Sequence, residues 1–255
     1  MPSQEIIVRL EPTGLATITF NRPNAANAIN TAMWKSLPHL VKSLEEEGAR
    51  LLIFTGTGKY FAAGADFDDL RQIVDHASAT CFWQAISNAL ETIAALKLPT
   101  IAMVNGPCLG GGCLLANACD LRFAALDAAI FGIPVARLGI VLDDNNIKRL
   151  VNLVGQARAK ELLFSAATIR STKAEAIGLI NKAVEDDQLS DFTHDFASTI
   201  LANSHLTIAA AKASIARLDS YMQSVDITNP TGTGQESAIA GYLSSDFRSR
   251  RDHEA

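Results

Sequence analysis

The sequence predicts an α/β protein whose C-terminal part is helical. The runs RLLIFTG (50–56) and PTIAMVNG (99–106) are almost continuously apolar and end in glycine, as is typical of strands covered on both faces. Helical periodicity fills the chain between them, and helical patterns replace strands after residue 143. We therefore expect an α/β core over residues 1–190 and a helical region over residues 191–255.

Two more pairs of strands are expected. IIVRL (6–10) and LATITF (15–20) alternate on either side of the turn EPTG (11–14), which predicts a hairpin. The segment DLRFAALDAAIFG (120–132) predicts a further pair of strands.

Two helices are expected between the strands of the first half. Apolar residues in 81–97 recur at intervals of four, four, three and three, and Pro99 ends this helix: Phe82, Ile86, Leu90, Ile93 and Leu96. A second apolar stripe over 34–44 predicts another helix. Pro38 then lies in its first turn, with Ser36 as its cap, or else kinks it.

The C-terminal half predicts a series of helices. One is expected to begin with a T-x-x-E capping box formed by Thr172 and Glu175. The segment 224–236 is rich in Thr, Gly, Asn and Pro and predicts a loop. The other expected helices cover residues 145–154, 156–164, 190–203 and 207–221.

Composition excludes several classes of function. The chain has 255 residues, 48% of them hydrophobic, and a formal net charge of −5, which disfavours nucleic acid as a partner. The first residues lack the pattern of a secretory or transit signal, and the most apolar region (104–142) carries too many polar residues to span a membrane. We expect a cytoplasmic protein with reduced cysteines, no metal and no membrane partner.

Two glycine-containing stretches carry the chemistry. LIFTGTGKYFAAGAD (52–66) and AMVNGPCLGGGCLLANACD (102–120) are each an apolar strand that runs into small residues, where backbone N–H groups become accessible. Two such N–H groups that converge on one oxygen form an oxyanion hole. Either stretch taken alone is also compatible with a tight, closely packed turn.

The two stretches, in this order and with a helix between them, closely resemble the enoyl-CoA hydratase/isomerase (crotonase) family. The resemblance implies a spiral of ββα units, a helical C-terminal region that builds a homotrimer or a dimer of trimers, and acyl-CoA thioester chemistry. It implies no cofactor beyond coenzyme A in the substrate, and it assigns the oxyanion donors to Ala65 and Gly111. The matching motifs are NRPNAANAIN (21–30), F-x-AGAD (61–66), NGPCLGGGC (105–113), FGIPVARLGIVLDD (131–144) and KAEAIGLINKAV (173–184).

The acidic residues depart from the family pattern. Hydratases of the family carry glutamates where this chain has Leu114 and Val135, and neither aliphatic side chain can transfer a proton. Asp143 matches the position of a functional aspartate in other members, so we expect it to be the catalytic base or nucleophile. As an alternative, Asp143 or Asp144 only caps the following helix.

The resemblance also assigns the substrate contacts. Lysines that meet the phosphates of coenzyme A in the family are replaced here by Asn24 and Asp68, for which Arg22, Lys59 or Arg71 could compensate. The expected substrate-binding residues are Ala28, Ala63 and Phe67 at the coenzyme A end, and Leu109, Gly110, Leu114, Val135 and Leu142 around the acyl group.

We therefore expect an acyl-CoA enzyme that acts through an oxyanion-stabilised enolate or tetrahedral intermediate, and we favour isomerase or hydrolase chemistry over hydration. Two alternatives stay open: a protein of this fold without catalysis, and an enzyme whose substrate is carrier-bound or a free diketone.

Overall fold

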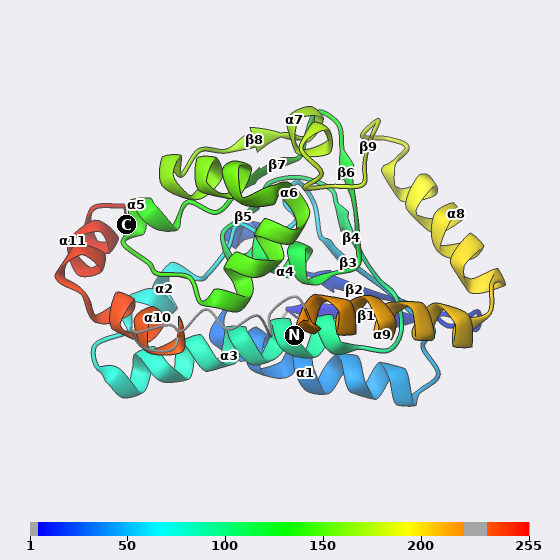
Figure 1. Cartoon of the computed structure of the whole chain (residues 1–255), viewed down its shortest axis with the longest axis horizontal. Helices are drawn as coiled ribbons and strands as arrows, with labels where there is room; N and C mark the ends of the chain where they lie inside the picture. The colour runs from blue at the N-terminus through cyan, green and yellow to red at the C-terminus, as the bar shows by residue number, and fades with distance from the viewer. Residues whose placement is uncertain (1–4, 222–233, 255) are drawn as a thin grey trace.

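The computed structural model describes residues 5–221 and 234–254, which form two sheets surrounded by helices (Figure 1). In the larger sheet β1 is antiparallel to β2, and every other neighbouring pair is parallel. Its six strands lie in the order β1 (Ile6–Leu10), β2 (Leu15–Phe20), β3 (Leu51–Gly56), β4 (Thr100–Val104), β6 (Leu121–Ala125) and β9 (Lys182–Val184).

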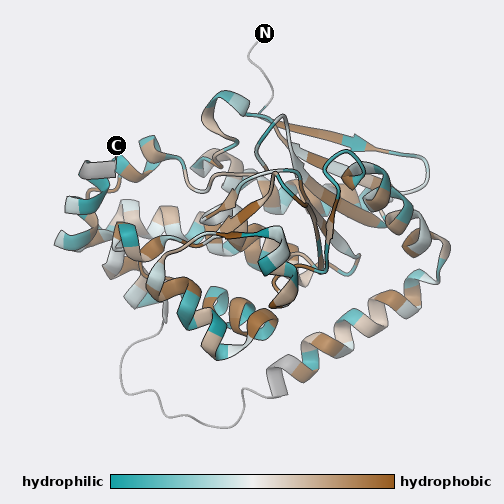
Figure 2. Ribbon diagram, turned by 90° about the horizontal axis from the view of Figure 1, so that it is seen from above, coloured by the Kyte–Doolittle hydropathy of each residue, from teal (hydrophilic) through white to brown (hydrophobic). Residues whose placement is uncertain are grey.

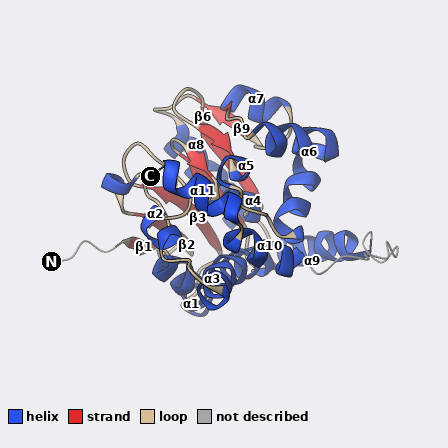
Figure 3. Ribbon diagram, turned by 90° about the vertical axis from the view of Figure 1, so that its left-hand side faces the viewer, coloured by secondary structure: helices blue, strands red, loops and turns tan. Residues whose placement is uncertain are grey.

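The predicted hairpin and buried strands are confirmed. β1 and β2 pair in the expected register, with Ile6 opposite Phe20 and Leu10 opposite Ala16. All six residues of β3 are buried, because this strand lies between β2 and β4 and helices lie around the sheet (Figure 3). Its unbroken apolar run therefore reflects cover on both faces.

The segment 120–132 forms two strands, but they do not pair with each other. β6 joins the larger sheet, whereas β7 (Ile130–Gly132) lies in a second sheet between β5 (Cys108–Leu109) and β8 (Ile169–Arg170). The hydroxyl of Ser171 donates to the carbonyls of Ala125 (2.6 Å) and Ala129 (3.2 Å) and so holds the intervening turn. The two strands were therefore predicted correctly, but the prediction that they pair with each other was wrong.

Both helices of the first half begin earlier than predicted. Helix α1 (Thr31–Glu46) starts after Asn30, whose side chain accepts a hydrogen bond from Met33 N at 2.8 Å. Ser36 is not a cap, since its hydroxyl donates to the Met33 carbonyl, and Pro38 lies inside the helix. Helix α3 (His76–Ala95) carries the predicted apolar stripe.

The start of α3 is fixed by a capping box that the apolar periodicity did not predict. The Asp75 side chain accepts from Ser78 N at 2.8 Å, and the Ser78 hydroxyl lies 3.1 Å from Asp75 N. These bonds satisfy donors that would otherwise be unpaired at the first turn.

The expected capping box at Thr172 was wrong. Helix α7 (Ser171–Ala176) begins after Arg170 without a side-chain cap, and the Glu175 carboxylate instead accepts from Ala183 N at 3.0 Å. The two helices expected over 145–164 form α6 (Asp144–Ser165), which is broken at Gly155 by a backbone φ of 75°.

From Leu189 onward, the secondary structure of the described chain is helical. Phe192 and Phe196 of α8 (Leu189–Ala202) pack edge-on against Phe123 of β6, with ring centroids about 5 Å apart. Helix α9 (His205–Tyr221) projects from the body (Figures 2 and 3). Most of the predicted loop 224–236 lies outside the described residues, but residues 234–236 begin α10 (Gly234–Leu243), which α11 (Ser245–Glu254) follows.

Parallel strands bring the functional segments to one edge of the sheet. The carboxyl ends of β3 and β4 lead into the two glycine-containing stretches, and the Asn105 side chain joins them. Its amide donates to the carbonyls of Gly56 (2.8 Å) and Gly58 (2.9 Å). A Cβ on Gly106 would lie 1.9 Å from the Lys59 carbonyl oxygen, so the two segments touch through their backbones. Within the described residues, no helix combines the length and apolarity needed to cross a membrane.

Gly106→Ala should therefore reduce the free energy of unfolding by more than about 3 kcal/mol, because an added methyl group meets backbone rather than a movable side chain. Gly48→Ala is the control: Gly48 has a φ of 98°, but a Cβ there would have no neighbour within 4 Å. That change should cost only about 1 kcal/mol of backbone strain. Urea unfolding measures both, and equal losses would contradict the packing described here.

Candidate active site

Two glycine turns place the candidate oxyanion donors. Gly64 (φ 110°) precedes Ala65, and Gly110 (φ 49°) precedes Gly111, the first residue of α4 (Gly111–Ala118). Positive φ values of this kind are rare for residues that carry a Cβ. Glycine therefore sets the direction of the N–H group that follows in both turns.

The two turns are in direct backbone contact. A Cβ on Gly64 would lie 3.1 Å from the Leu109 carbonyl oxygen and 3.5 Å from Gly111 N. A Cβ on Gly112 would lie only 2.3 Å from the carbonyl oxygen of Ala62. The glycine triplet therefore allows the backbones of the two turns to approach closely, as its sequence indicated.

Short stretches of β-type pairing hold this contact. Ala62 pairs with Cys108, and Leu109 N donates to the Ala62 carbonyl at 3.0 Å. On the other side, Ile29 pairs with Ala65, using a bond of 2.9 Å from Ile29 N to the Gly64 carbonyl. The loops that follow β2, β3 and β4 are thus joined into one unit.

This pairing does not use the N–H groups of Ala65 and Gly111. A Cβ on Gly111 would lie 3.7 Å from Ala65 N, so the two residues are adjacent. No hydrogen bond within the described residues has either N–H as its donor. The Gly111 N–H also stands at the positive end of the α4 dipole. The structure therefore places the two residues of the predicted pair next to each other.

Asp143 lies at the start of α6, a helix that packs against α4. Its carboxylate is only 8% exposed and accepts three hydrogen bonds. Trp83 Nε1 and Asn146 Nδ2 donate to Oδ2 at 3.1 and 3.0 Å, and Asn146 N donates to Oδ1 at 2.9 Å. Asp143 does cap the helix, and it also has a fixed orientation that a cap alone does not require.

The residues expected around the acyl group lie in or against the apolar core, or lead into α4. Leu114 is buried on α4, and Leu142 is partly buried next to Asp143. Val135 begins the short helix α5 (Val135–Leu138) and packs against the core, while Leu109 and Gly110 lead into α4. The sequence did not indicate the polar contact from Trp83, because it joins α3 to α6 across 60 residues of chain.

At the expected coenzyme A end, Arg22 is tied to neighbouring acids. Its guanidinium contacts Glu5 at 3.0 Å and Asp66 at 2.6 Å, and it donates to the Ala28 carbonyl at 2.7 Å. These bonds hold the turn after β2 against the Asp66 side chain. Arg22 is therefore bound within the protein and is a poor replacement for a phosphate-binding lysine.

The other expected contacts at this end lie near α2 (Phe67–Arg71). Ala63 N donates to the Ala26 carbonyl, and Phe67 is 39% exposed on the first turn. Arg71 pairs with Asp68 at 2.9 Å. At this end of the site, the arginines that could have bound a phosphate thus lie next to carboxylates.

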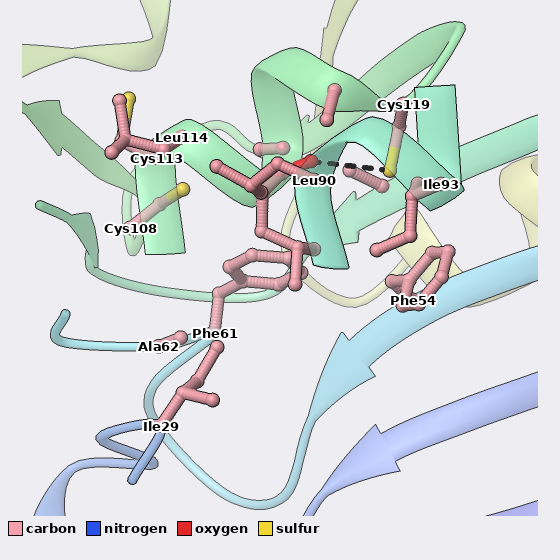
Figure 4. Packing of buried hydrophobic residues seen from close by; sticks show 14 of the residues in the cluster. Ile29, Phe54, Phe61, Ala62, Leu90, Ile93, Cys108, Cys113, Leu114 and Cys119 are labelled. Carbon is pink, nitrogen blue, oxygen red and sulfur yellow. Dashed lines mark hydrogen bonds between the residues drawn. The ribbon is translucent and has the colours of Figure 1, made fainter. Parts of the chain in front are cut away.

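The cysteines are free thiols in the structure. Figure 4 shows Cys108, Cys113 and Cys119 within the buried apolar cluster. Burial raises the pKa of the Cys108 thiol, and it raises that of Cys119 to about 12. A thiol that stays protonated is a poor nucleophile, so these two residues serve packing.

The C-terminal helices reach the Asp143 region of the same chain. Tyr242 of α10 packs edge-on against Phe82 (5.4 Å) and Phe247 (5.6 Å). Burial, together with the negative charge of nearby Asp143, raises the pKa of the Tyr242 hydroxyl. Among the described residues, no group of three or more His, Cys, Asp or Glu is placed to hold a metal ion.

Comparison with known proteins agrees with this geometry. The sequence model of the enoyl-CoA hydratase/isomerase family matches residues 11–238. The chain belongs to the enoyl-CoA hydratase/isomerase family. It is 36% identical to a short-chain-enoyl-CoA hydratase of Clostridium acetobutylicum over 82% of this chain and 81% of that protein. It is 38% identical to a crotonyl-CoA hydratase of Syntrophomonas wolfei over 84% of this chain and 82% of that protein.

Solved structures of the family share the whole fold. A family member from Hyphomonas neptunium superposes with a TM-score of 0.82 at 30% identity, covering 96% of this chain and 92% of that chain. A methylmalonyl-CoA decarboxylase in complex with 2-nitronate-propionyl-CoA gives 0.84 at 26% identity, covering 98% and 95%. The predicted crotonase fold is thus confirmed, and the chain is an acyl-CoA-processing member of its family.

Asp66 gives the site a measurable pH dependence. Partial burial acts to raise its pKa, but hydrogen bonds from the Arg22 side chain and Asp68 N outweigh this and hold the pKa below the ordinary value of 3.8. Such a carboxylate stabilises the fold above its unfolded-state pKa, and the contribution is lost as the pH falls through the folded-state pKa.

Asp66→Asn should therefore lower the free energy of unfolding by about 1–3 kcal/mol at pH 7. The difference from the unmodified protein should shrink as the pH falls below 3.8. Asp68→Asn is the control, since its side chain is 82% exposed and pairs only with Arg71; its effect should stay below about 0.5 kcal/mol. Denaturant unfolding at several pH values tests this, and a difference for Asp66→Asn that is independent of pH would refute it.

Proposed function

We propose that the protein converts acyl-CoA thioesters through an enolate or tetrahedral oxyanion held by the N–H groups of Ala65 and Gly111. The observation that carries this proposal is the presence of two adjacent, unpaired backbone donors, one of them at the start of α4. A thioester oxygen that gains negative charge would accept a hydrogen bond from each of these two N–H groups. Each such donor typically contributes 10²–10³ in rate.

We favour isomerisation or hydrolysis over the addition of water. Hydration needs a group that delivers water and a group that protonates carbon, and Leu114 and Val135 can do neither. Asp143 is then the acid or base. In isomerisation it would take a proton from the carbon next to the thioester carbonyl and return it to another carbon of the acyl chain. In hydrolysis it would activate water or attack the thioester carbon itself. Relatives named as hydratases and a decarboxylase on one fold support the view that the side chains select the reaction.

The coenzyme A of the thioester is the one cofactor we propose, and Ala28, Ala63 and Phe67 are its expected contacts. A second candidate substrate is an acyl group on a carrier protein, or a free diketone. Its support is the pairing of Arg22 with Glu5 and Asp66, which leaves fewer cations for phosphates. Binding of coenzyme A itself separates the two candidates.

We also propose a cytoplasmic homotrimer or dimer of trimers. Its support is α9, where Leu206, Ile215 and Leu218 are each at least 65% exposed. Burial of these exposed apolar side chains against other copies would remove the cost of exposing them to water. Sedimentation velocity distinguishes these assemblies from a monomer, and a monomer at micromolar concentration would exclude them.

Asp143→Asn tests the proposed acid or base. Asparagine is an equally good helix cap, so the start of α6 should be retained, while turnover should fall at least about 100-fold. The exposed neighbour Asp144 gives the control Asp144→Asn, which should stay within about threefold of the unmodified protein. The reactions to follow are the shift of the double bond in a 3-enoyl-CoA, thiol release from acyl-CoA, and hydration of crotonyl-CoA.

Full turnover by Asp143→Asn would remove that residue from the mechanism. If hydration of crotonyl-CoA is the fastest of the three reactions, the proposed reaction class is wrong. No turnover of any acyl-CoA, together with no binding of coenzyme A, would favour the second candidate or a protein without catalysis.

A further inference from the structure

A chain of polar contacts joins Asp143 to residues further along α6 and on α3. The Asn146 side chain donates from Nδ2 to Oδ2 of Asp143 at 3.0 Å, and Arg149 Nη1 donates to Oδ1 of Asn146 at 3.2 Å. Arg149 also forms an ion pair of 2.7 Å with Glu91 of α3. Four residues from two helices are therefore linked, and the residue at the inner end of the chain is the proposed acid or base.

These contacts fix the orientation of the Asn146 amide. An asparagine amide has one end that donates and one that accepts, whereas a guanidinium only donates and an ionised carboxylate only accepts. Arg149 therefore keeps the amide oxygen of Asn146 on its own side and the NH₂ group toward Asp143. Without the guanidinium the amide would be free to turn over, and its oxygen would then face the carboxylate of Asp143.

Glu91 holds Arg149 in place from the neighbouring helix. Its Oε1 accepts from Arg149 Nη2 at 2.7 Å and from Asn145 Nδ2 at 3.0 Å. The side chain of Arg149 is 15% exposed, whereas that of Glu91 is 47% exposed. A long side chain such as arginine loses much of its freedom when both ends of its guanidinium have partners. The outer pair thus limits where the inner hydrogen bond to Asn146 can be made.

The same contacts leave one part of the Asp143 carboxylate available. Oδ2 accepts from Trp83 Nε1 and Asn146 Nδ2, whereas Oδ1 accepts from the backbone N–H of Asn146. Each carboxylate oxygen is able to accept about two hydrogen bonds. Within the described part of the chain, Oδ1 therefore keeps one accepting position for a proton or a water molecule.

We propose that Arg149 is a positioning residue for Asp143 and that Glu91 supports it. Arg149 holds the Asn146 amide, the amide holds Oδ2 together with Trp83, and Oδ1 is the atom that reacts. This proposal rests on the proposed function, because it needs Asp143 to act on the substrate. A small displacement of a reacting group slows the chemical step, so the loss should appear in kcat.

Arg149→Met tests the proposal, because methionine keeps an apolar stem but donates no hydrogen bond. For the fastest acyl-CoA reaction, kcat should fall about tenfold while KM changes less than about twofold. Arg149→Lys still donates and should bring kcat back to within about threefold of the unmodified protein. Arg158→Met is the matched control: Arg158 lies on the same helix and pairs with Glu161 at 2.6 Å, and its loss should change kcat less than about twofold.

An exchange of charges separates positioning from ion pairing. Glu91→Arg combined with Arg149→Glu keeps an ion pair between α3 and α6, but a carboxylate at position 149 accepts hydrogen bonds and would turn the NH₂ group of Asn146 away from Asp143. The double variant should unfold at a urea concentration close to that of the unmodified protein and still lose about tenfold in kcat. Full kcat in this variant would show that the ion pair serves stability alone, and the proposal would be wrong.

A double-mutant cycle tests whether Arg149 acts through Asp143. In the Asp143→Asn background, Arg149→Met should change kcat less than about twofold, because the carboxylate that it positions is gone. A further tenfold loss in that background would mean that Arg149 acts on something else, which would overturn the proposal.

The outcomes separate this proposal from the proposed function. If Asp143→Asn loses turnover while Arg149→Met keeps it, the positioning role is wrong and the proposed function stands. If Asp143→Asn keeps full turnover, or if no acyl-CoA is converted, the proposed function fails and the positioning role fails with it.

Discussion

The close approach of two glycine turns is the constraint on which the site depends. A Cβ on Gly64 would lie 3.1 Å from the Leu109 carbonyl oxygen, and one on Gly112 would lie 2.3 Å from the Ala62 carbonyl oxygen, so the two turns meet through their backbones. The turns can meet because parallel strands β3 and β4 deliver them to the same edge of the sheet. The pairing of Ala62 with Cys108 then fixes their register. The adjacent, unpaired N–H groups of Ala65 and Gly111 are a consequence of this contact, on which the proposed oxyanion hole depends.

Much of the fold and the oxyanion pair could be predicted because their signals are local. An apolar run such as β3 or an apolar stripe such as that of α3 depends on neighbouring residues in the sequence. Helix starts were predicted less well, since the capping at Asn30 and at Asp75 depends on one polar residue outside the apolar pattern. The contact of Trp83 with Asp143 could not be predicted. Trp83 lies outside the apolar stripe of α3, and only tertiary packing determines where its N–H group lies.

The acid–base part of the site is less closely tied to the fold. Asp143 receives its orientation from Trp83 on α3 and Asn146 on its own helix, and Tyr242 of α10 adds cover from the C-terminal region. In the proposed mechanism the oxyanion donors belong to the backbone, whereas the acid or base is a side chain, which can differ between proteins of one fold. This separation explains how relatives of one fold carry names that describe different reactions.

The ultraviolet spectrum of bound acetoacetyl-CoA tests the central claim most directly, because this thioester forms an enolate without turnover. If Ala65 and Gly111 hold an oxyanion, binding will increase the enolate absorbance at a fixed pH and lower the apparent pKa of the ligand. A bound ligand whose spectrum and apparent pKa match those in free solution would contradict the account.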